Sequence, residues 1–441
     1  MKRITLRAVG GLAVCALALG LAGCGTADQT GDPAQSGTPA SAGGEDVTLR
    51  MYWWGGDARH QRTQEVIKLF EAKYPNITVK PEFADWNGYW DKLATATAGK
   101  TSPDVIQMDA QYLAEYAGRG ALTNLSDLEI DTTKMDQSVL DMGTWDGEFY
   151  AVPASVASMA VAVNTDLVEE YGVPLPDNTD TWTYEEFNEW AAKVTKAAPD
   201  GVYGGQAMSV EFQLQLFARQ NGENIFEGNK IVLKPETVEK FLKTDLDWVE
   251  SGAAAPASVF SETVNLPLDQ LPIATGKAVT SFITSPQVSA YSEASGANID
   301  LLHLPTMPNG VEKYDYLKPG MYWTVSSQTE HPAEAALLID FILNDPEAVK
   351  IIGTERGIPA NEGTLEEIRE DLTPEEIKAV DYVESESSII GDAPPAPPAG
   401  SSKMGEDLIR YVQEVLSERL TPAEAAQQFI DGVQASIDAA N

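Results

Sequence analysis

Aromatic and polar side chains gather in this sequence at the points where predicted strands end. These side chains are Trp53, Trp54, Asp57, Arg59, His60, Trp86, Asp109, Tyr112 and Trp323. Because the carboxyl ends of neighbouring parallel strands meet at one edge of a sheet, all of them could face one crevice. Aromatic rings stack on the CH faces of a sugar ring, while carboxylate, guanidinium and imidazole groups bind its hydroxyls. The combination therefore indicates a carbohydrate-binding site.

Tryptophan is also a common core residue, so each ring could equally be a buried filler. Trp90, Trp190 and Trp248 fall within helical patterns and are predicted to lie in the core. Trp53, Trp54, Trp86 and Trp323 stand at strand ends or turns and remain candidates for ligand contact.

Catalytic signatures are missing from the sequence. The only histidines are His60, His303 and His331, with no His-x-x-x-His pair, so a zinc site is not expected. The chain has no Gly-x-Ser-x-Gly or Gly-x-x-x-x-Gly-Lys-Ser/Thr motif, and both cysteines lie before residue 25. We therefore expect no catalytic residue, metal or cofactor and no enzyme, although 67 acidic residues leave a glycosidase carboxylate pair open.

The net charge excludes one class of partner. The 441 residues include 30 Lys and Arg against 67 Asp and Glu, which gives a formal charge of -37. Such a surface repels a phosphate backbone, so nucleic acid is not a partner.

The first 23 residues have the layout of a secretory signal. Lys2, Arg3 and Arg7 precede an apolar run that is too short to span a bilayer. The run ends in Leu21–Cys24, which resembles the bacterial lipobox and implies cleavage before Cys24 and lipidation of its thiol. Residues 24–46 then read as a lipid-anchored flexible tether. The alternative is an uncleaved membrane anchor with a chance cysteine.

The folded body reads as an α/β protein of two regions. In the first, strands are predicted at 47–54, 77–83 and 104–108, and helices at 61–74, 88–98 and 110–117. This alternation favours a mostly parallel sheet. In the second, helices are predicted at 183–196, 210–220, 236–250, 333–343, 374–385, 403–418 and 422–439, and strands at 278–283, 299–304 and 322–326. The run 393–400, Ala-Pro-Pro-Ala-Pro-Pro-Ala-Gly, must be extended and is read as a connection.

Several short motifs in fixed order carry a resemblance to a known family. They include Trp-Trp-Gly after the first strand, Ser102–Val105, Tyr150–Pro153, Thr181–Thr183, Gly276–Val279, Pro332–Ala336 and Gly357–Asn361. Over nearly all of residues 47–441 the chain resembles the extracellular solute-binding proteins, family 1, which serve carbohydrate importers of the ATP-binding-cassette (ABC) class.

This resemblance implies a two-lobed fold of the periplasmic-binding-protein type II, each lobe a mainly parallel sheet flanked by helices. The chain would cross between the lobes three times, with residues 47–155 and 321–393 in the N-terminal lobe and 156–320 and 394–441 in the C-terminal lobe. By position, the resemblance adds Glu211, Phe212, Gln287 and Arg356 to the nine ligand-facing residues above.

The function implied is capture of a sugar and its delivery to the permease subunits of an ABC importer. The protein would be a monomer, lipid-anchored to the outer face of the bacterial cell membrane. Three alternatives stay open: a secreted glycoside hydrolase, a surface adhesin, and the same fold binding a peptide, polyamine or metal.

Overall fold

The structure, a computed structural model, describes residues 44–440. The predicted signal, the lipidation at Cys24 and the tether up to residue 43 lie outside the described residues. Within the described part, no helix is long and apolar enough to cross a membrane.

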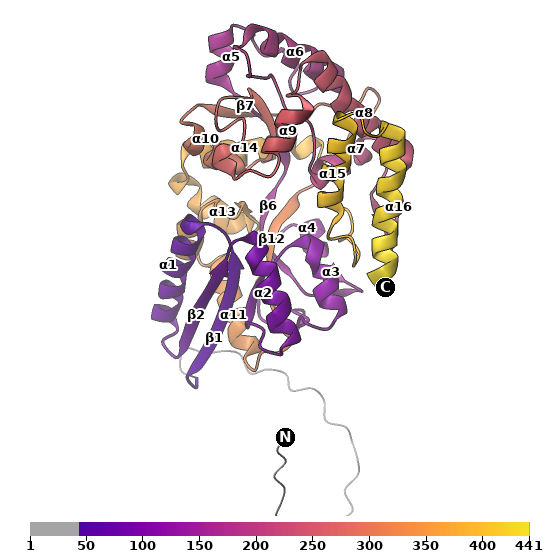
Figure 1. The fold of residues 1–441 in the computed structure, drawn as a ribbon. Coiled ribbons are helices and arrows are strands. Elements are labelled where there is room, and N and C mark those ends of the chain that lie inside the picture. Colours follow the sequence, from indigo (N-terminus) through magenta and orange to yellow (C-terminus); the bar gives the residue numbers. More distant parts are fainter. Residues whose placement is uncertain (1–43, 441) are drawn as a thin grey trace, which may run out of the picture. The chain divides into compact units, whose positions relative to one another are not determined.

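The first sheet has six strands in the order β13-β6-β12-β3-β1-β2 (Figure 1). Its strands are β1 (Val47–Trp54), β2 (Ile77–Ala84), β3 (Val105–Met108), β6 (Val152–Ala157), β12 (Lys318–Val325) and β13 (Ile358–Pro359). β1 pairs in parallel with β2 and β3, whereas β12 runs antiparallel to both β3 and β6, and β13 antiparallel to β6. The α/β class is confirmed, but this sheet is mixed rather than mainly parallel.

The second sheet is antiparallel throughout, which also corrects the expectation of a mainly parallel sheet. Its order is β10-β7-β11, with β7 (Met159–Asn164) between β10 (Thr280–Thr284) and β11 (Ile299–Leu302). A parallel pair needs a crossover connection of a dozen or more residues. Only Ser158 separates β6 in the first sheet from β7 in the second, so the chain passes directly between the sheets there.

Helices cover both faces of the first sheet. One face packs against α1 (Asp57–Lys73), α11 (Pro332–Asn344) and α12 (Pro346–Ile352), and the other against α2 (Trp86–Ala98) and α3 (Ala110–Gly118). Successive side chains of a strand point to opposite faces. Trp53 therefore lies in the core with Phe70 of α1, while Trp54 lies in the core with Tyr89 of α2.

Most of the other helices surround the second sheet. They are α5 (Thr165–Tyr171), α6 (Tyr184–Ala197), α7 (Glu211–Gln220), α8 (Pro235–Ser251), α9 (Ala257–Thr263), α10 (Gln287–Ser295), α14 (Pro374–Ser385), α15 (Met404–Leu416) and α16 (Pro422–Ala440). α8 contacts α6, α7, α15 and α16 (Figure 1). α14 packs against α10 and β11 of the second sheet, whereas the predicted boundary counted residues 321–393 with the first lobe.

Short elements complete the body. They are α4 (Gln137–Asp141), α13 (Glu362–Ile368), the hairpins β4 (Thr144–Trp145) with β5 (Glu148–Phe149) and β8 (Phe226–Glu227) with β9 (Lys230–Ile231), and 3₁₀ turns at Leu268–Gln270, Arg369–Asp371 and Glu386–Ser388.

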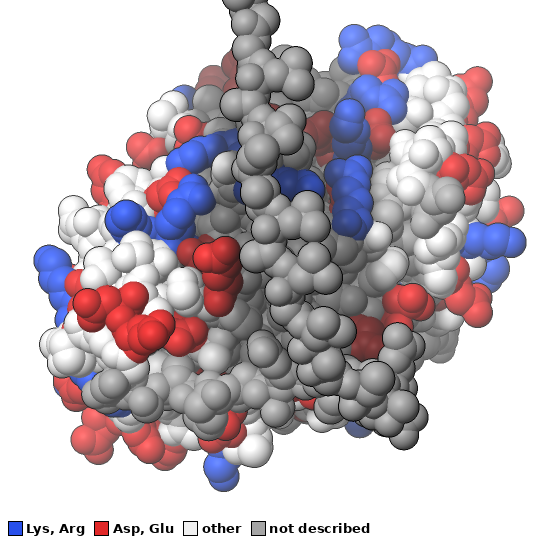
Figure 2. Space-filling view, turned by 90° about the horizontal axis from the view of Figure 1, so that it is seen from below, with Lys and Arg blue, Asp and Glu red and all other residues white. Residues whose placement is uncertain are grey.

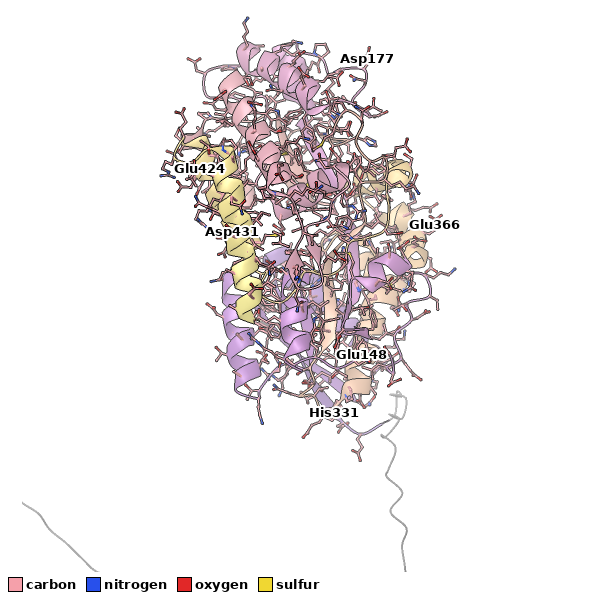
Figure 3. All side chains as sticks on the ribbon, turned by 90° about the vertical axis from the view of Figure 1, so that its right-hand side faces the viewer. Glu148, Asp177, His331, Glu366, Glu424 and Asp431 are labelled. Carbon is pink, nitrogen blue, oxygen red and sulfur yellow. The ribbon has the colours of Figure 1, made fainter. Side chains whose placement is uncertain are left out.

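Figure 2 shows charged side chains on one face of the body. Acidic and basic side chains are interspersed there. Glu424 and Asp431 extend outward from α16, where both are exposed (Figure 3).

A buried carboxyl pair lies where the connections between the sheets meet. Asp315 and Glu386 are both completely buried. Asp315 precedes β12 and exchanges backbone hydrogen bonds with Ile389 and Gly391, while Glu386 accepts a hydrogen bond from Tyr382 at 2.6 Å. Burial raises the pKa of both carboxyls, and the charge of Glu386 raises that of Asp315 further. The pair therefore retains a proton well above the pH at which free carboxyls ionise.

Candidate functional site

Three turns between a strand and a helix define one edge of the first sheet. β1, β2 and β3 are neighbours in the sheet and run in the same direction, so α1, α2 and α3 all begin at the same edge. Asp85 caps α2 by accepting a hydrogen bond from the backbone N–H of Gly88 at 2.9 Å. Asp109 caps α3 by accepting from that of Gln111 at 3.0 Å. As the sequence predicted, this edge brings Trp54, Trp86 and Asp109 to neighbouring turns.

Aromatic side chains form a continuous cluster at this edge, made of Trp54, Trp86, Tyr89, Trp90 and Tyr112. The ring centroids of Trp54 and Trp86 are 5.0 Å apart in an edge-to-face arrangement, and those of Trp90 and Tyr112 are 3.8 Å apart and stacked. Trp54 and Trp90 are 8% exposed, whereas Trp86 is 37% exposed. Trp86 is therefore the most exposed tryptophan of this aromatic cluster.

The first turn of α15 lies close to the start of α3. Met404 and Gly405 of α15 line the same cavity as Asp109 at the α3 turn. Burial, the largest cause, raises the pKa of Tyr112 in α3, and the charges of Asp109 and Glu406 add to the shift. Helices packed on the two sheets therefore meet at the start of α3.

A cavity of about 70 Å³, here called the proline-lined cavity, lies beside the α3 turn. Asp109 and Lys318 line it from the first sheet, and Glu211 and Phe212 line it from α7. Prolines 394, 395 and 397 also border it, so the run predicted to be a connection forms part of its wall. A Cβ built on Gly405 would lie 3.0 Å from Oε2 of Glu211. The carboxylate of Glu211 therefore lies at the first turn of α15, where a helix favours negative charge.

A larger cavity of about 530 Å³, here called the arginine-lined cavity, also lies between elements of the two sheets. Arg59 and Arg62 of α1 line one side, and Gln287 of α10 lines the other. Lys318 borders both this cavity and the proline-lined cavity. Its volume falls within the range of about 300 to 1,000 Å³ that is typical of small-molecule sites. Lys318 at the start of β12 therefore lies between the two cavities, which are here together called the cleft.

The polar groups of the arginine-lined cavity are partly paired with each other. Nε of Arg59 donates to both carboxylate oxygens of Glu355, at 2.8 and 3.0 Å. Oε1 of Gln287 accepts from the backbone N–H and the hydroxyl of Thr284, at 3.0 and 3.1 Å. Arg356 also lines this cavity but its side chain is only 3% exposed.

Two of the predicted tryptophans are fully buried in the structure. Trp53 and Trp323 are 0% exposed, and both pack in the core between the first sheet and helices α1 and α11. The ring nitrogen of Trp53 donates to Nδ1 of His60 at 3.1 Å. In this conformation neither indole ring presents a face to a ligand, because both side chains point to the opposite side of the sheet from the aromatic cluster.

His60 and Asp57 lie apart from the aromatic cluster. The ring of His60 stacks on Phe83 with centroids 4.0 Å apart, and burial lowers its pKa. His60 is therefore a neutral acceptor for the indole of Trp53. Asp57 is exposed on the first turn of α1.

The structure thus distributes the predicted site residues among several places. The aromatic cluster and the two cavities hold Trp54, Trp86, Tyr112, Asp109, Glu211, Phe212, Arg59, Gln287 and Arg356, while Trp53, His60, Trp323 and Asp57 lie elsewhere. Sequence reasoning did not include Lys318 and Glu406 in the site. The sequence carried a signal for both, since Lys318 stands at a predicted crossing and Glu406 follows the proline run. Residues 44–440 contain no group of three or more His, Cys, Asp or Glu side chains placed to hold a metal ion.

Residues 65–378 match the family model of the bacterial extracellular solute-binding proteins. Among curated proteins, the chain is 31% identical to the diacetylchitobiose binding protein DasA of Streptomyces coelicolor over 182 residues. This alignment covers 41% of each chain, so the match spans less than half of that relative's length.

Solved structures of solute-binding proteins share the fold. The extracellular solute-binding protein family 1 from Alicyclobacillus acidocaldarius is 26% identical, with a TM-score of 0.69, over 90% of this chain and 99% of that one. A periplasmic oligogalacturonide binding protein from Yersinia enterocolitica, solved with saturated digalacturonic acid, is 22% identical, with a TM-score of 0.78, over 89% of this chain and 99% of that one.

Proposed function

Because the chain belongs to the family of bacterial extracellular solute-binding proteins, we propose that it captures a sugar or oligosaccharide between its two sheets and delivers it to the membrane subunits of an ABC importer. The observation that carries this proposal is the aromatic cluster at the edge of the first sheet, with Trp86 exposed and carboxylates nearby. Two similar proteins are named for sugar ligands, diacetylchitobiose and oligogalacturonide.

The groups around the cleft suit the chemistry of a sugar. The ring of Trp86 stacks on the CH face of a pyranose, and the carboxylates of Asp109 and Glu211 accept hydrogen bonds from its hydroxyls. Phe212 adds an apolar wall opposite the α3 turn. No step in this mechanism breaks a covalent bond, so the protein acts as a binding protein and not as an enzyme.

Ligand binding favours the conformation in which both sheets contact the solute. A solute that touches Trp86 from the first sheet and Glu211 from the second binds the closed form more tightly than the open form, and so shifts the population toward closure. Ser158, a single residue between β6 and β7, lies where such a motion bends the chain. The closed form then presents both lobes to the permease.

The remaining parts of the proposal concern the membrane. Cys24 carries a lipid, and residues 24–46 tether the body to the outer face of the bacterial cell membrane. A monomer suffices for this role, because one chain supplies both sides of the cleft. We also propose the lobe boundaries given by the sequence, with residues 47–155 and 321–393 in one lobe and residues 156–320 and 394–441 in the other. α14 falls in the range 321–393 but packs on the second sheet.

The proposal is tested by melting residues 25–441 with a panel of mono- and oligosaccharides, using amino acids, peptides and polyamines as controls. A ligand present at 100 times its Kd stabilises the folded state by about 2.7 kcal/mol, which raises the melting temperature measurably. We expect one class of sugar to do so and to be recovered unchanged. A shift with a control compound alone would contradict the sugar assignment, and recovery of a cleaved sugar would make the protein a glycosidase.

A further inference from the structure

A small cavity lined by core residues of the first sheet lies beside the arginine-lined cavity, with which it shares Arg356 and Gly357. Its volume is about 20 Å³, enough for one particle of about the size of a water molecule. Arg356 and Trp323 line it, together with aliphatic side chains such as Ile342 and Val349. It lies next to the loop 353–357, which also borders the arginine-lined cavity.

Several hydrogen-bond donors of these two side chains have no acceptor. Nη2 of Arg356 donates to the hydroxyl of Thr63 at 2.7 Å. Nε and Nη1 of Arg356 and Nε1 of Trp323 are buried and have no hydrogen-bond partner among the described residues. The guanidinium carbon lies 5.5 Å from the centre of the Trp323 ring, so the two groups are neighbours. Leaving a buried charged donor unpaired costs more than leaving a neutral donor unpaired.

The cavity contains no side-chain acceptor. Its other lining residues are aliphatic side chains, glycines and a proline, none of which carries an acceptor on its side chain. Two of the nearby carbonyls are already used: that of Ile352 accepts from Arg62 at 2.6 Å, and that of Arg356 accepts from Ser155. A water molecule here accepts from the N–H groups but finds no side-chain acceptor for its own protons. An anion needs only donors.

The local charge also favours an anion. The carboxylate nearest to Arg356 is Glu355, whose Oε2 is 3.7 Å from Nη1, too far for a hydrogen bond. Glu355 is already bound through both oxygens by Arg59. Burial, with the charges of Arg59 and Arg62, lowers the pKa of Arg356 to about 9. A guanidinium without a full counter-charge is therefore buried in a protein whose formal charge is -37.

We propose that this cavity is a binding site for a small monatomic anion of the halide class, held by an unpaired guanidinium N–H of Arg356 and by Nε1–H of Trp323. The anion neutralises the buried guanidinium and fixes the loop 353–357, and so one wall of the arginine-lined cavity. The site does not depend on the identity of the solute.

Diffraction from crystals of the full chain soaked in sodium bromide tests the proposal directly. The expected result is an anomalous peak inside the cavity, in contact with both Arg356 and Trp323, that is absent from crystals kept in sodium gluconate. Bromide peaks at surface lysines and arginines alone would mean an adventitious ion only. That result, or a water molecule with no anomalous signal in the cavity, would overturn the proposal.

Melting curves in solution provide a second measurement that needs no crystal. At constant ionic strength, replacing gluconate by chloride or bromide is expected to raise the melting temperature of the full chain. Trp323→Phe removes one donor and is expected to weaken the halide affinity by about tenfold, the loss typical of one hydrogen bond to a charged group. Arg356→Gln is expected to abolish the halide response.

Trp182→Phe is the matched control, because Trp182 is also 0% exposed but its indole N–H donates to the carbonyl of His303 at 2.9 Å. Its halide response is expected to equal that of the unmodified chain. An equal response in Trp323→Phe as well would contradict the proposal, and this comparison decides the question even if Arg356→Gln does not fold.

Discussion

Replacing Asp315 by Asn tests whether the buried carboxyl pair holds a proton at neutral pH. The pKa values of Asp315 and Glu386 are raised in the folded state, so the native protein binds at least one more proton than the unfolded chain above pH 4 or so. Stability that is present at acid pH is then lost as the pH rises, by about 1.4 kcal/mol per pH unit for each such proton.

Asn keeps the geometry but removes the ionisation. Its carbonyl oxygen can accept the 2.7 Å hydrogen bond that Asp315 receives from the N–H of Tyr316, and its amide can donate to Glu386 in place of the proton. Between pH 5 and pH 7, the free energy of unfolding of Asp315→Asn is therefore expected to fall less steeply than that of the unmodified protein, by up to about 1.4 kcal/mol per pH unit.

Urea unfolding at pH 5, 6 and 7 measures this difference through the extrapolated free energy of unfolding. Glu367→Gln is the control, because it removes an exposed carboxylate and is expected to leave the pH dependence unchanged. If Asp315→Asn and the unmodified protein lose stability in parallel over this range, the pair does not hold the extra proton and the reasoning is refuted.

Three further substitutions separate binding from stability. Trp86→Ala is expected to weaken sugar binding by about 1 to 3 kcal/mol in calorimetry. Trp145→Ala, outside the cleft, is the control and is expected to leave the affinity unchanged. If Trp86→Ala binds the sugar as tightly as the unmodified protein does, Trp86 is not part of the site. Trp53→Phe loses the hydrogen bond to His60 and is expected to lower the free energy of unfolding by about 1 kcal/mol in urea unfolding. Its sugar affinity is expected to stay unchanged, and a loss of affinity would contradict the buried placement of Trp53. Lys318→Met keeps the packing of its methylene stem but removes a charge from both cavities. It is expected to weaken a uronic-acid ligand by about tenfold and a neutral sugar much less, as titrations of both ligands would show.

Local patterns in the sequence predicted the elements well. β1 and α14 have the predicted bounds, because a period of two and a period of 3.6 in apolar residues distinguish strands from helices. Sheet pairing was not predictable in the same way. β3 lies beside β12, more than 200 residues further along the chain, and nothing in either strand specifies that antiparallel partner.

The site was predicted in part, for a similar reason. The turns after β1, β2 and β3 were placed correctly because parallel neighbours share an edge. Trp53 and Trp54 were both predicted to face the ligand, but the structure places them in the cores on opposite sides of the sheet, because neighbours on a strand face opposite sides. The sequence signalled Lys318 only through its place at a predicted crossing, because its position between the two cavities depends on how α7, α10 and β12 come together.

A crystal structure with the sugar found in the melting panel tests most directly whether a sugar binds unchanged between the two sheets. We expect density for an intact sugar that stacks on Trp86 and contacts at least one residue of the second sheet, such as Glu211. A sugar bound outside the cleft, a cleaved sugar, or a site that involves only one sheet would contradict it.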